Sequence, residues 1–307
     1  MTKRTNDQWQ LWIMVMPLLA WLALFTYRPL SGLRIAFQDY SPFLGDKSPY
    51  IMFDNFKELL VGTHSDYFWR AFRNTIMISI YGLVFAFPMP IILAILFHQL
   101  KRERFRKTVQ TIMYVPHFIS EVIVCSIVVT ILGMNTGLIN IILQKIVTAL
   151  GGEYTQLHFL AKKEWFWGIF TGVGIWKECG FESIVYFAAL CGVSEELYEA
   201  AKVDGAGRLK QIWHVSIPGI MPTIATMFII RVGNMLNVGY ERVLLLYNPG
   251  IYETADILST FTYRLGIQMS PEYGLSTAAS IFNSVISLAM VIIANKVSRK
   301  ISETGLW

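Results

Sequence analysis

Six long apolar blocks constrain what this chain can fold into more than any other feature. They cover residues 11–27, 71–97, 109–132, 165–192, 222–246 and 275–294. Each block is long enough for a helix to cross the ~30 Å hydrocarbon core of a bilayer. Soluble helices show amphipathic periods instead of such continuous apolar runs. We therefore predict an all-α membrane protein with six transmembrane helices, in a single transmembrane domain over residues 1–307.

Composition excludes several other classes of protein. Hydrophobic residues make up 54% of the chain and charged residues only 15%, against about 25% charged residues in soluble domains. The basic residues lie beside the apolar blocks and form no long stripe, which argues against nucleic-acid binding. No Gly-x4-Gly-Lys-Ser/Thr loop occurs, so we expect no nucleotide hydrolysis by this chain.

Cysteines and histidines give no sign of a metal site. Cys125, Cys179 and Cys191 all lie inside apolar blocks and form no Cys-x-x-Cys pair, so we interpret them as small buried hydrophobic residues. The five histidines are scattered without metal-ligand spacing. The sequence therefore predicts no metal site.

The distribution of basic residues predicts the orientation in the membrane. Half of the 26 Lys and Arg residues lie in four short segments, 1–10, 98–108, 193–221 and 295–307. Basic loops stay on the cytoplasmic side, so we predict that both termini are cytoplasmic. No small-residue cleavage site follows the first block, which is therefore predicted to be a retained span and not a signal peptide.

Two external segments and one kink complete the predicted topology. Residues 28–70 should fold outside the membrane, with a short helix from Asp54–Asn55 to Leu60, because Asp and Asn are good N-caps. Leu138–Leu150 has the pattern of an amphipathic helix at the membrane interface, ended by Gly151–Gly152. Pro88 and Pro90 interrupt the second block, and the carbonyls that they free need other partners.

The polar segment 194–218 lies between the fourth and fifth blocks, on the predicted cytoplasmic side. Ser194 or Glu195 can cap a helix whose first turn is rich in acids. The small residues Ala200 and Ala201 leave a surface that another protein can approach closely. Asp204–Gly205 should then break the helix.

A second helix is expected from about Leu209, with Ile212, Trp213 and Val215 as an apolar ridge and Pro218 as its end. The two helices would form a short, structured hairpin between two spans. One interpretation is a contact with a soluble partner. The alternative is a well-capped connection with no partner.

The residues Glu199-Ala-Ala-Lys-Val-Asp-Gly-Ala, followed after eight residues by Val215-Ser-Ile-Pro218, resemble the EAA motif of ABC-importer membrane subunits. The spacing matches the family pattern. Val215 stands for Ile and Ile217 for Leu, both conservative changes. The resemblance implies coupling to an ATPase through Glu199, Ala200, Ala201, Asp204, Gly205, Ala206 and Pro218.

Further stretches, such as the one from Tyr27-Arg-Pro to Ser41-Pro-Phe and that from Gly239-Tyr-Glu-Arg to Asn248-Pro, resemble the carbohydrate branch of these importers. The branch takes up oligosaccharides, often from uronate-containing polysaccharides such as alginate or pectin. It implies a type I importer in the bacterial inner membrane, with a second permease, favouring a heterodimer. It also implies two ABC ATPases that carry ATP and Mg, and an external solute-binding protein.

Charged and amide side chains inside spans are costly and usually face a water-filled path. On a continuous fifth span, four such residues would fall within about 120° of one face. Glu121 and Asn283 lie at similar depth in other spans. The resulting candidates for a substrate path are Lys177, Glu178, Glu182, Arg231, Asn234, Asn237 and Glu241.

Other functions for these residues stay open at this stage. A purely structural ion pair, for example Arg231 with Glu178, is one alternative. A membrane-embedded enzyme using Glu178, Glu182 and His117 as acid–base groups is another. A channel or scaffold subunit is a third. Neither the enzyme nor the channel gives the EAA-like segment a purpose, so we expect a transport subunit that does no chemistry itself.

Overall fold

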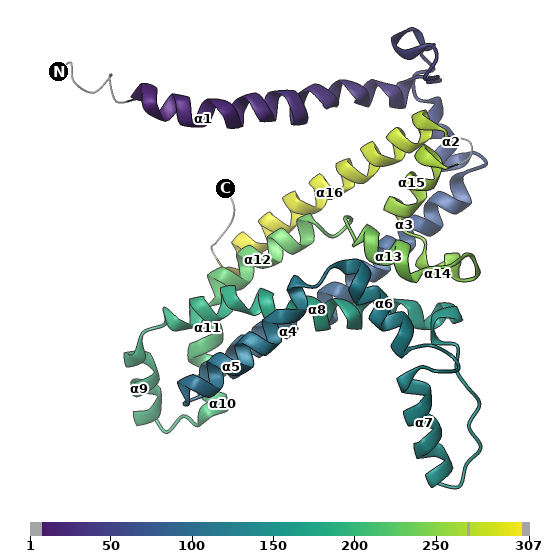
Figure 1. Ribbon diagram of the computed structural model, residues 1–307. Helices are drawn as coiled ribbons and strands as arrows, with labels where there is room; N and C mark the ends of the chain where they lie inside the picture. Colours follow the sequence, from purple (N-terminus) through teal and green to yellow (C-terminus); the bar gives the residue numbers. More distant parts are fainter. Residues whose placement is uncertain (1–7, 269–270, 303–307) are drawn as a thin grey trace, which may run out of the picture. The chain divides into compact units, whose positions relative to one another are not determined.

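A computed structural model describes residues 8–268 and 271–302 of the chain, and the described part is built from helices (Figure 1). The chain divides into two compact units. Unit 1 comprises Met1–Ser65 with Thr262–Phe282, and unit 2 comprises Asp66–Phe261 with Asn283–Trp307. Each unit is described by itself below.

Unit 1 contains a long N-terminal helix and a short folded segment. The helix runs through α1 (Gln8–Leu22), the π-helical η1 (Ala23–Tyr27) and the 3-10 helix η2 (Arg28–Phe37). Next come η3 (Gly45–Lys47) and α2 (Asp54–Val61). The end of α15 (Leu258–Ile267) and the start of α16 (Tyr273–Ser302) also belong to this unit.

The predicted helix near residues 54–60 is confirmed as α2, but its polar residues act differently. Phe53 occupies the N-cap position and no side chain caps the helix. Asn55 instead donates hydrogen bonds to the carbonyls of Ala36 at 2.9 Å and Gln38 at 3.1 Å. A Cβ on Gly274 would lie 2.5 Å from Nδ2 of Asn55, so the first turn of α16 packs onto this cluster because residue 274 has no side chain.

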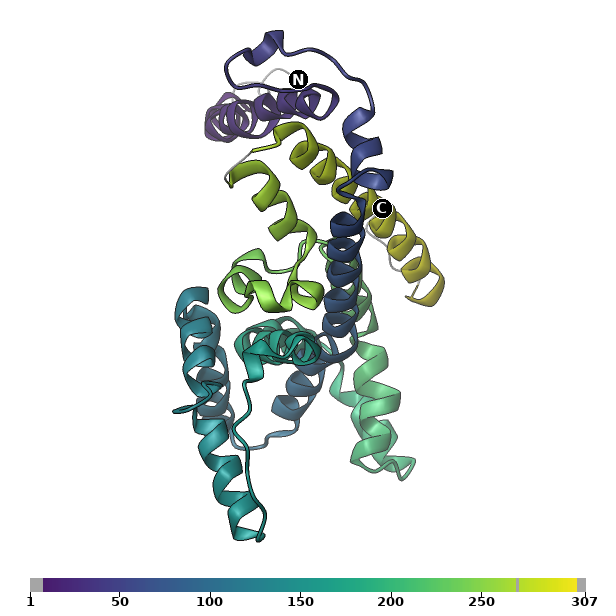
Figure 2. The same ribbon diagram turned by 90° about the vertical axis from the view of Figure 1, so that its right-hand side faces the viewer.

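Unit 2 holds the remaining helices (Figures 1 and 2). The first group is α3 (Ser65–Tyr81), η4 (Gly82–Ala86), α4 (Pro88–Gln99), α5 (Glu103–Tyr114), η5 (Val115–Phe118), α6 (Glu121–Ile131) and α7 (Leu138–Ala149). The second is η6 (Phe159–Ala161), η7 (Lys163–Trp165), α8 (Phe166–Cys191), α9 (Glu195–Val203), α10 (Arg208–Gln211), η8 (Ile212–Ser216) and α11 (Ile217–Gly219). The last is α12 (Met221–Gly233), α13 (Tyr240–Leu246), η9 (Pro249–Ile251) and α14 (Tyr252–Ala255).

The prolines of the second apolar block are accommodated by a π-helical turn. Ser65–Gln99 is one long helical segment, and η4 lies directly before Pro88 within it. The Phe87 N–H donates to the Gly82 carbonyl at 2.9 Å, a π-type bond. Such local π adjustments supply partners around a proline in a membrane helix.

The prediction of six continuous spans is wrong for two of the six blocks. Three helices of the described chain are long and apolar enough to cross a membrane: Trp9–Phe37, Ser65–Gln99 and Tyr273–Val297. Block 109–132 is broken, because Glu121–Ile131 turns by 98° from Glu103–Phe118. Block 222–246 is also broken, because α12 ends at Gly233 and α13 begins at Tyr240.

The fourth block forms the 26-residue helix α8, long enough to span a bilayer. It carries three charged residues in its middle, Lys177, Glu178 and Glu182. The number of six spans, the cytoplasmic position of the termini and the single domain stay predictions.

α8 takes part in two hydrophobic clusters of unit 2. One cluster joins it to α4 through Ala94, Ile95, Tyr186 and Leu190, with Ile220 beside them. Another contains Phe166 and Phe170 of α8 with Val243 and Leu246 of α13.

α5 approaches α8 through a glycine. A Cβ on Gly180 would lie 1.9 Å from the Met113 carbonyl oxygen. No side chain fits there, so the path of α5 along α8 depends on glycine at this position.

Candidate functional site

Ser194 and Gly205 set the limits of α9, the first leg of the hairpin over residues 194–219. The Ser194 hydroxyl accepts a hydrogen bond from the Glu196 N–H at 3.3 Å, which confirms the predicted cap. At the other end the Ala206 N–H donates to the Ala201 carbonyl at 2.8 Å, and the Gly205 N–H donates to the Lys202 carbonyl at 3.0 Å. These two bonds form a Schellman motif, with Gly205 at φ +73°. The predicted break at Asp204–Gly205 is therefore confirmed.

Two side-chain hydrogen bonds hold the legs of the hairpin in place. Gln211 donates from Nε2 to the Ala206 carbonyl at 2.8 Å, across the turn. The hydroxyls of Tyr198 on α9 and Ser216 on η8 are 3.0 Å apart. The hairpin is thus cross-linked at its turn and near its base.

The outer surface of the hairpin carries exposed apolar side chains. Val203 is 87% exposed, Leu209 75% and Trp213 66%. Of the predicted ridge only Trp213 is exposed, whereas Ile212 and Val215 are partly buried. Adjoining exposed apolar side chains mark an interaction surface.

The prediction that Pro218 ends the second helix is wrong. The helix passes through α10, η8 and α11 to Gly219, and only then turns by 63° into α12. Pro218 lies in the first turn of α11, directly after the π-helical η8. A missing N–H is tolerated at such a position.

A cavity of about 260 Å³ lies between α3, η4, α8, α12 and α13, all in unit 2. Its polar lining residues are Ser79, Thr171, Glu178, Glu182, Arg231, Asn234, Asn237 and Arg242. Five of the seven candidates for a substrate path are among them. The break between α12 and α13 brings Asn234 and Asn237 to the cavity from non-helical backbone. The argument from one face of a continuous fifth helix was therefore wrong, although its residues do converge.

The other two candidates lie elsewhere. Glu241 is exposed and does not line the cavity. Its neighbour Arg242 does, and the Arg242 guanidinium pairs with Glu121 and lies 5.2 Å from the ring of Phe170. Sequence reasoning missed Arg242. Its signal was a second charge beside Glu241 at the start of an apolar run, but choosing between neighbours requires the phase of α13.

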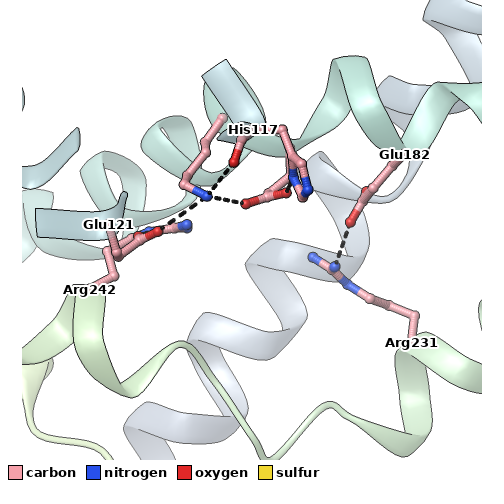
Figure 3. Close-up of polar contacts among 7 residues, drawn as sticks. His117, Glu121, Glu182, Arg231 and Arg242 are labelled. Carbon is pink, nitrogen blue, oxygen red and sulfur yellow. Dashed lines mark hydrogen bonds and ion pairs between the residues drawn. The ribbon is translucent and has the colours of Figure 1, made fainter. Parts of the chain in front are cut away.

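Lys177 contacts both Glu121 and Glu178 and is at the centre of a charge network beside the cavity. Figure 3 labels His117 and Glu121, two other members of this network. The Lys177 ammonium lies 2.9 Å from Glu178 and 3.6 Å from Glu121, and donates to the His117 carbonyl at 3.3 Å. Nδ1 of His117 is 2.6 Å from the second oxygen of Glu178. The side chain of Lys177 is only 10% exposed. Because it contacts both His117 and Glu121, Lys177 ties α8 to the bend between η5 and α6.

Arg231 and Glu182 form a separate, looser pair across the cavity, with Nη1 of Arg231 3.4 Å from Oε1 of Glu182 (Figure 3). Both side chains are partly exposed, 41% for Arg231 and 33% for Glu182. The alternative ion pair of Arg231 with Glu178 is wrong. Arg231 pairs with Glu182, and Glu178 pairs with Lys177 and His117.

The described residues contain no group of three or more His, Cys, Asp or Glu side chains placed to hold a metal ion. His117 and Glu178 do lie together, as the enzyme alternative required. Both are, however, engaged in the network around Lys177.

Known proteins resemble this chain over almost its whole length. Protein LplB of Bacillus subtilis (strain 168) is 40% identical, with 98% of this chain and 92% of that protein covered. The polygalacturonan/rhamnogalacturonan transport system permease protein YteP of the same organism is 38% identical, with 98% and 91% covered.

Solved structures agree with these relatives. The crystal structure of a bacterial ABC transporter involved in the import of the acidic polysaccharide alginate contains a chain that is 44% identical, with a TM-score of 0.88 and 98% of both chains covered. A second structure shows a bacterial alginate ABC transporter in complex with an alginate pentasaccharide-bound periplasmic protein, again at 44% identity and a TM-score of 0.88, with 99% of both chains covered.

Residues 86–303 match the family model described as binding-protein-dependent transport system inner membrane component. This match covers more than half of the chain, and the hairpin and the cavity wall from Ala86 onward lie inside it. The chain belongs to the family of inner membrane components of binding-protein-dependent transport systems.

Proposed function

We propose that this chain is a permease subunit of an ATP-driven importer for acidic oligosaccharides derived from polysaccharides. The proposal is supported by relatives named for polygalacturonan/rhamnogalacturonan and alginate transport. The observation that carries it is the hairpin over residues 194–219, which is cross-linked internally and apolar on its outer surface. Such an element transmits force between a soluble partner and the adjoining membrane helices.

The hairpin is the docking site for an ABC ATPase in this proposal. Glu199, Ala200 and Gly205 are exposed around its turn, and Ala201, Asp204, Ala206 and Pro218 complete the matched motif. Closure of the ATPases around ATP and Mg would pull on α9 and α11 and so move α8 and α12, which flank the cavity. ATP hydrolysis belongs to the partner, and this chain needs no cofactor of its own.

The cavity is the substrate path in this proposal. Asn234 and Asn237 offer both donors and acceptors to sugar hydroxyls. The cation that meets a substrate carboxylate is Arg231, because its single contact with Glu182 is long and partly exposed. A bidentate bond to a uronate carboxylate would be stronger than that contact. Arg242 and Lys177 are less available, because each is already held by carboxylates.

The partners follow from the importer architecture. We expect a second permease, in a heterodimer, together with two ATPases and an extracytoplasmic solute-binding protein in the bacterial inner membrane. The periplasmic protein bound to the alginate transporter supports this composition.

ATPase stimulation tests the proposal. The assembled complex in lipid vesicles should hydrolyse ATP faster when its binding protein is loaded with an oligogalacturonate or oligoalginate than when it is loaded with a neutral oligosaccharide. The Arg231→Gln variant should lose the response to acidic oligosaccharides by roughly tenfold, the scale of one charge-assisted hydrogen bond. Arg104→Gln, which removes an exposed arginine of α5 away from the cavity, is the matched control. Equal stimulation by neutral sugars, in both variants, contradicts the acidic substrate.

A further inference from the structure

The helix α7 has an exposed apolar face that the transport mechanism does not use. At 100° per residue Leu138, Ile142, Ile146 and Ala149 fall within about 80° of one another. Leu138 is 54% exposed, Ile142 43% and Ile146 50%. Lys145 is the one charged residue of the helix and borders this face. We call Leu138, Ile142, Lys145, Ile146 and Ala149 the outer face of α7.

The opposite side of α7 is covered by the returning chain. Buried Asn140 donates to the carbonyls of Gly133 at 3.0 Å and Leu157 at 2.9 Å, and accepts from the Leu157 N–H at 3.0 Å and the Tyr154 hydroxyl at 2.5 Å. Past the helix end the Gly152 N–H donates to the Val147 carbonyl at 2.9 Å. These bonds fix the rotation of α7, so the outer face is presented in one direction.

The position of α7 ties it to the membrane part of its unit. Only residues 132–137 separate it from the end of the apolar helix α6, and the Gly137 N–H donates to the Gly133 carbonyl at 3.1 Å in that turn. Figure 1 draws α8 across the page and α7 down it, and in both views α7 extends away from the other helices of unit 2 (Figures 1 and 2). The helix therefore runs across the direction of α8, near the end of α8 that begins at Phe166.

A bilayer surface fits these observations better than a soluble protein does. A helix that runs across a membrane-crossing helix, close to its end, lies along the interface. Exposure of an apolar face to water costs free energy whenever a transient protein partner is absent. Lipid would cover the face at all times. The single Lys145 at the border can extend its ammonium to the headgroups.

We propose that α7 is an interfacial anchor, whose outer face inserts between the headgroups and acyl chains of the extracytoplasmic leaflet. It fixes the turn after α6, and through Asn140 the returning chain up to Leu157, at a constant depth beside the cavity. The proposal does not depend on the transported solute, so it would hold even if the substrate were neutral.

Spin-label accessibility in the assembled importer tests the anchor. Cys191, which is exposed, is replaced by serine, and Ile142→Cys, Ile146→Cys and Ala149→Cys are labelled one at a time in vesicles of phosphatidylethanolamine and phosphatidylglycerol. Thr148→Cys is the matched control, because Thr148 is exposed and lies about 120° around α7 from the middle of the outer face. We expect the ratio of accessibility to oxygen over a water-soluble nickel chelate to be several-fold higher at residues 142, 146 and 149 than at 148.

Three results would overturn the anchor. Equal access of the nickel chelate to all four positions would place the outer face in water. Protection that appears only after the binding protein is added would make this face a docking surface for that protein. Exclusion of both oxygen and nickel, unchanged in detergent, would show burial against the second permease. Stimulated ATPase activity of each labelled complex verifies that it is folded.

Discussion

At the residue scale, the charges beside the cavity differ in how firmly they are held. Lys177 has three oxygen partners and little exposure, whereas Arg231 has one partner at 3.4 Å. Removal of a buried cation leaves its carboxylate partners buried without an opposite charge. The resulting loss of stability is far larger than the net stabilisation from the intact pair. Lys177 is therefore a positioning residue, and Arg231 remains available to a ligand.

Replacement of Lys177 by methionine tests the positioning role of Lys177. The variant keeps the side-chain volume but leaves Glu178 without a lysine partner and Glu121 with Arg242 alone, so we expect a loss of about 3 kcal/mol in stability. The midpoint of thermal unfolding of the assembled complex in detergent reports it. Lys177→Met combined with Glu178→Gln should recover part of the loss. A Lys177→Met complex as stable as the parent would contradict the positioning role.

Gly205 allows a test of the hairpin. Its φ of +73° strains any side chain, although a Cβ there would meet no other atom within 4 Å. Gly205→Val should cost about 1–2 kcal/mol in the turn and also place bulk on the docking surface. We expect normal membrane expression with sugar uptake lost or uncoupled from ATP hydrolysis.

Asparagine is the matched control for Gly205, since it tolerates the left-handed region. Gly205→Asn should retain most of the uptake rate. Unchanged uptake by the Gly205→Val variant would refute the assignment of this turn to ATPase coupling.

At the element scale, α8 organises unit 2, and its glycines differ in what surrounds them. A Cβ on Gly180 would collide with the backbone of Met113, whereas one on Gly172 would meet nothing within 4 Å. Gly180→Ala should therefore displace α5 and destabilise the complex by about 1–3 kcal/mol. Gly172→Ala, on the same helix, should be neutral or slightly stabilising because alanine favours helices. Equal unfolding midpoints for the two variants would contradict the close packing of α5 on α8.

An exposed ion pair ties α14 to the start of α8. Lys163 donates to Glu253 at 2.7 Å, and this bond, together with the positive charge, holds the pKa of the Glu253 carboxyl below its ordinary 4.5. A carboxyl with a lowered pKa stabilises the fold at neutral pH and loses that contribution as the pH falls through its folded-state value. Hydrogen exchange around residues 249–257, corrected for intrinsic rates, should thus increase at acidic pH. The Glu253→Gln variant should show no such step, and a step of equal size in that variant would exclude the pair as its cause.

Helix content was predictable from the sequence, but helix breaks were not. The cap at Ser194, the turn at Gly205 and the helix Leu138–Ala149 all follow from local rules for caps and glycines. The break at residues 234–239 has no proline, and apolar residues occur on both sides of it and within it. Averaging hydropathy over a span-length window therefore does not reveal the break. Pro218 was expected to end the helix. The helix instead continues to Gly219, because Pro218 follows a π-helical turn and lies in the first turn of α11.

The candidate site was predictable in its residues but not in its pairs. Polar residues in apolar blocks identified Glu178, Glu182, Arg231, Asn234 and Asn237 as cavity residues. Pairing depends on distances between helices that are remote in sequence. Lys177 was predicted to line the substrate path, but it pairs with Glu121 and Glu178 and does not line the cavity. Arg242, which was not predicted, does line it.

At the scale of the whole molecule, the proposed substrate path and the proposed coupling element belong to the same unit. Both lie in unit 2, joined by α8 and α12, which run from the hairpin to the cavity. Movement of the hairpin would therefore reach Glu182 along α8 and Arg231 along α12, after one turn of the chain in each case. The external loops and α7 are linked to the same helices. Movement of the hairpin would therefore also displace these segments of unit 2.

The pairing of charges around the cavity has a consequence at long range. The three carboxylates Glu121, Glu178 and Glu182 are matched by the three cations Lys177, Arg242 and Arg231, so the formal charges of these six side chains cancel. Paired charges exert little field at long range, so the acidic oligosaccharide proposed as substrate would be distinguished only at short range. The rate of uptake at saturating loaded binding protein should then change little between about 0.05 and 0.5 M salt, although the Debye length falls about threefold. A steep decline with salt would reveal electrostatic steering by the wall.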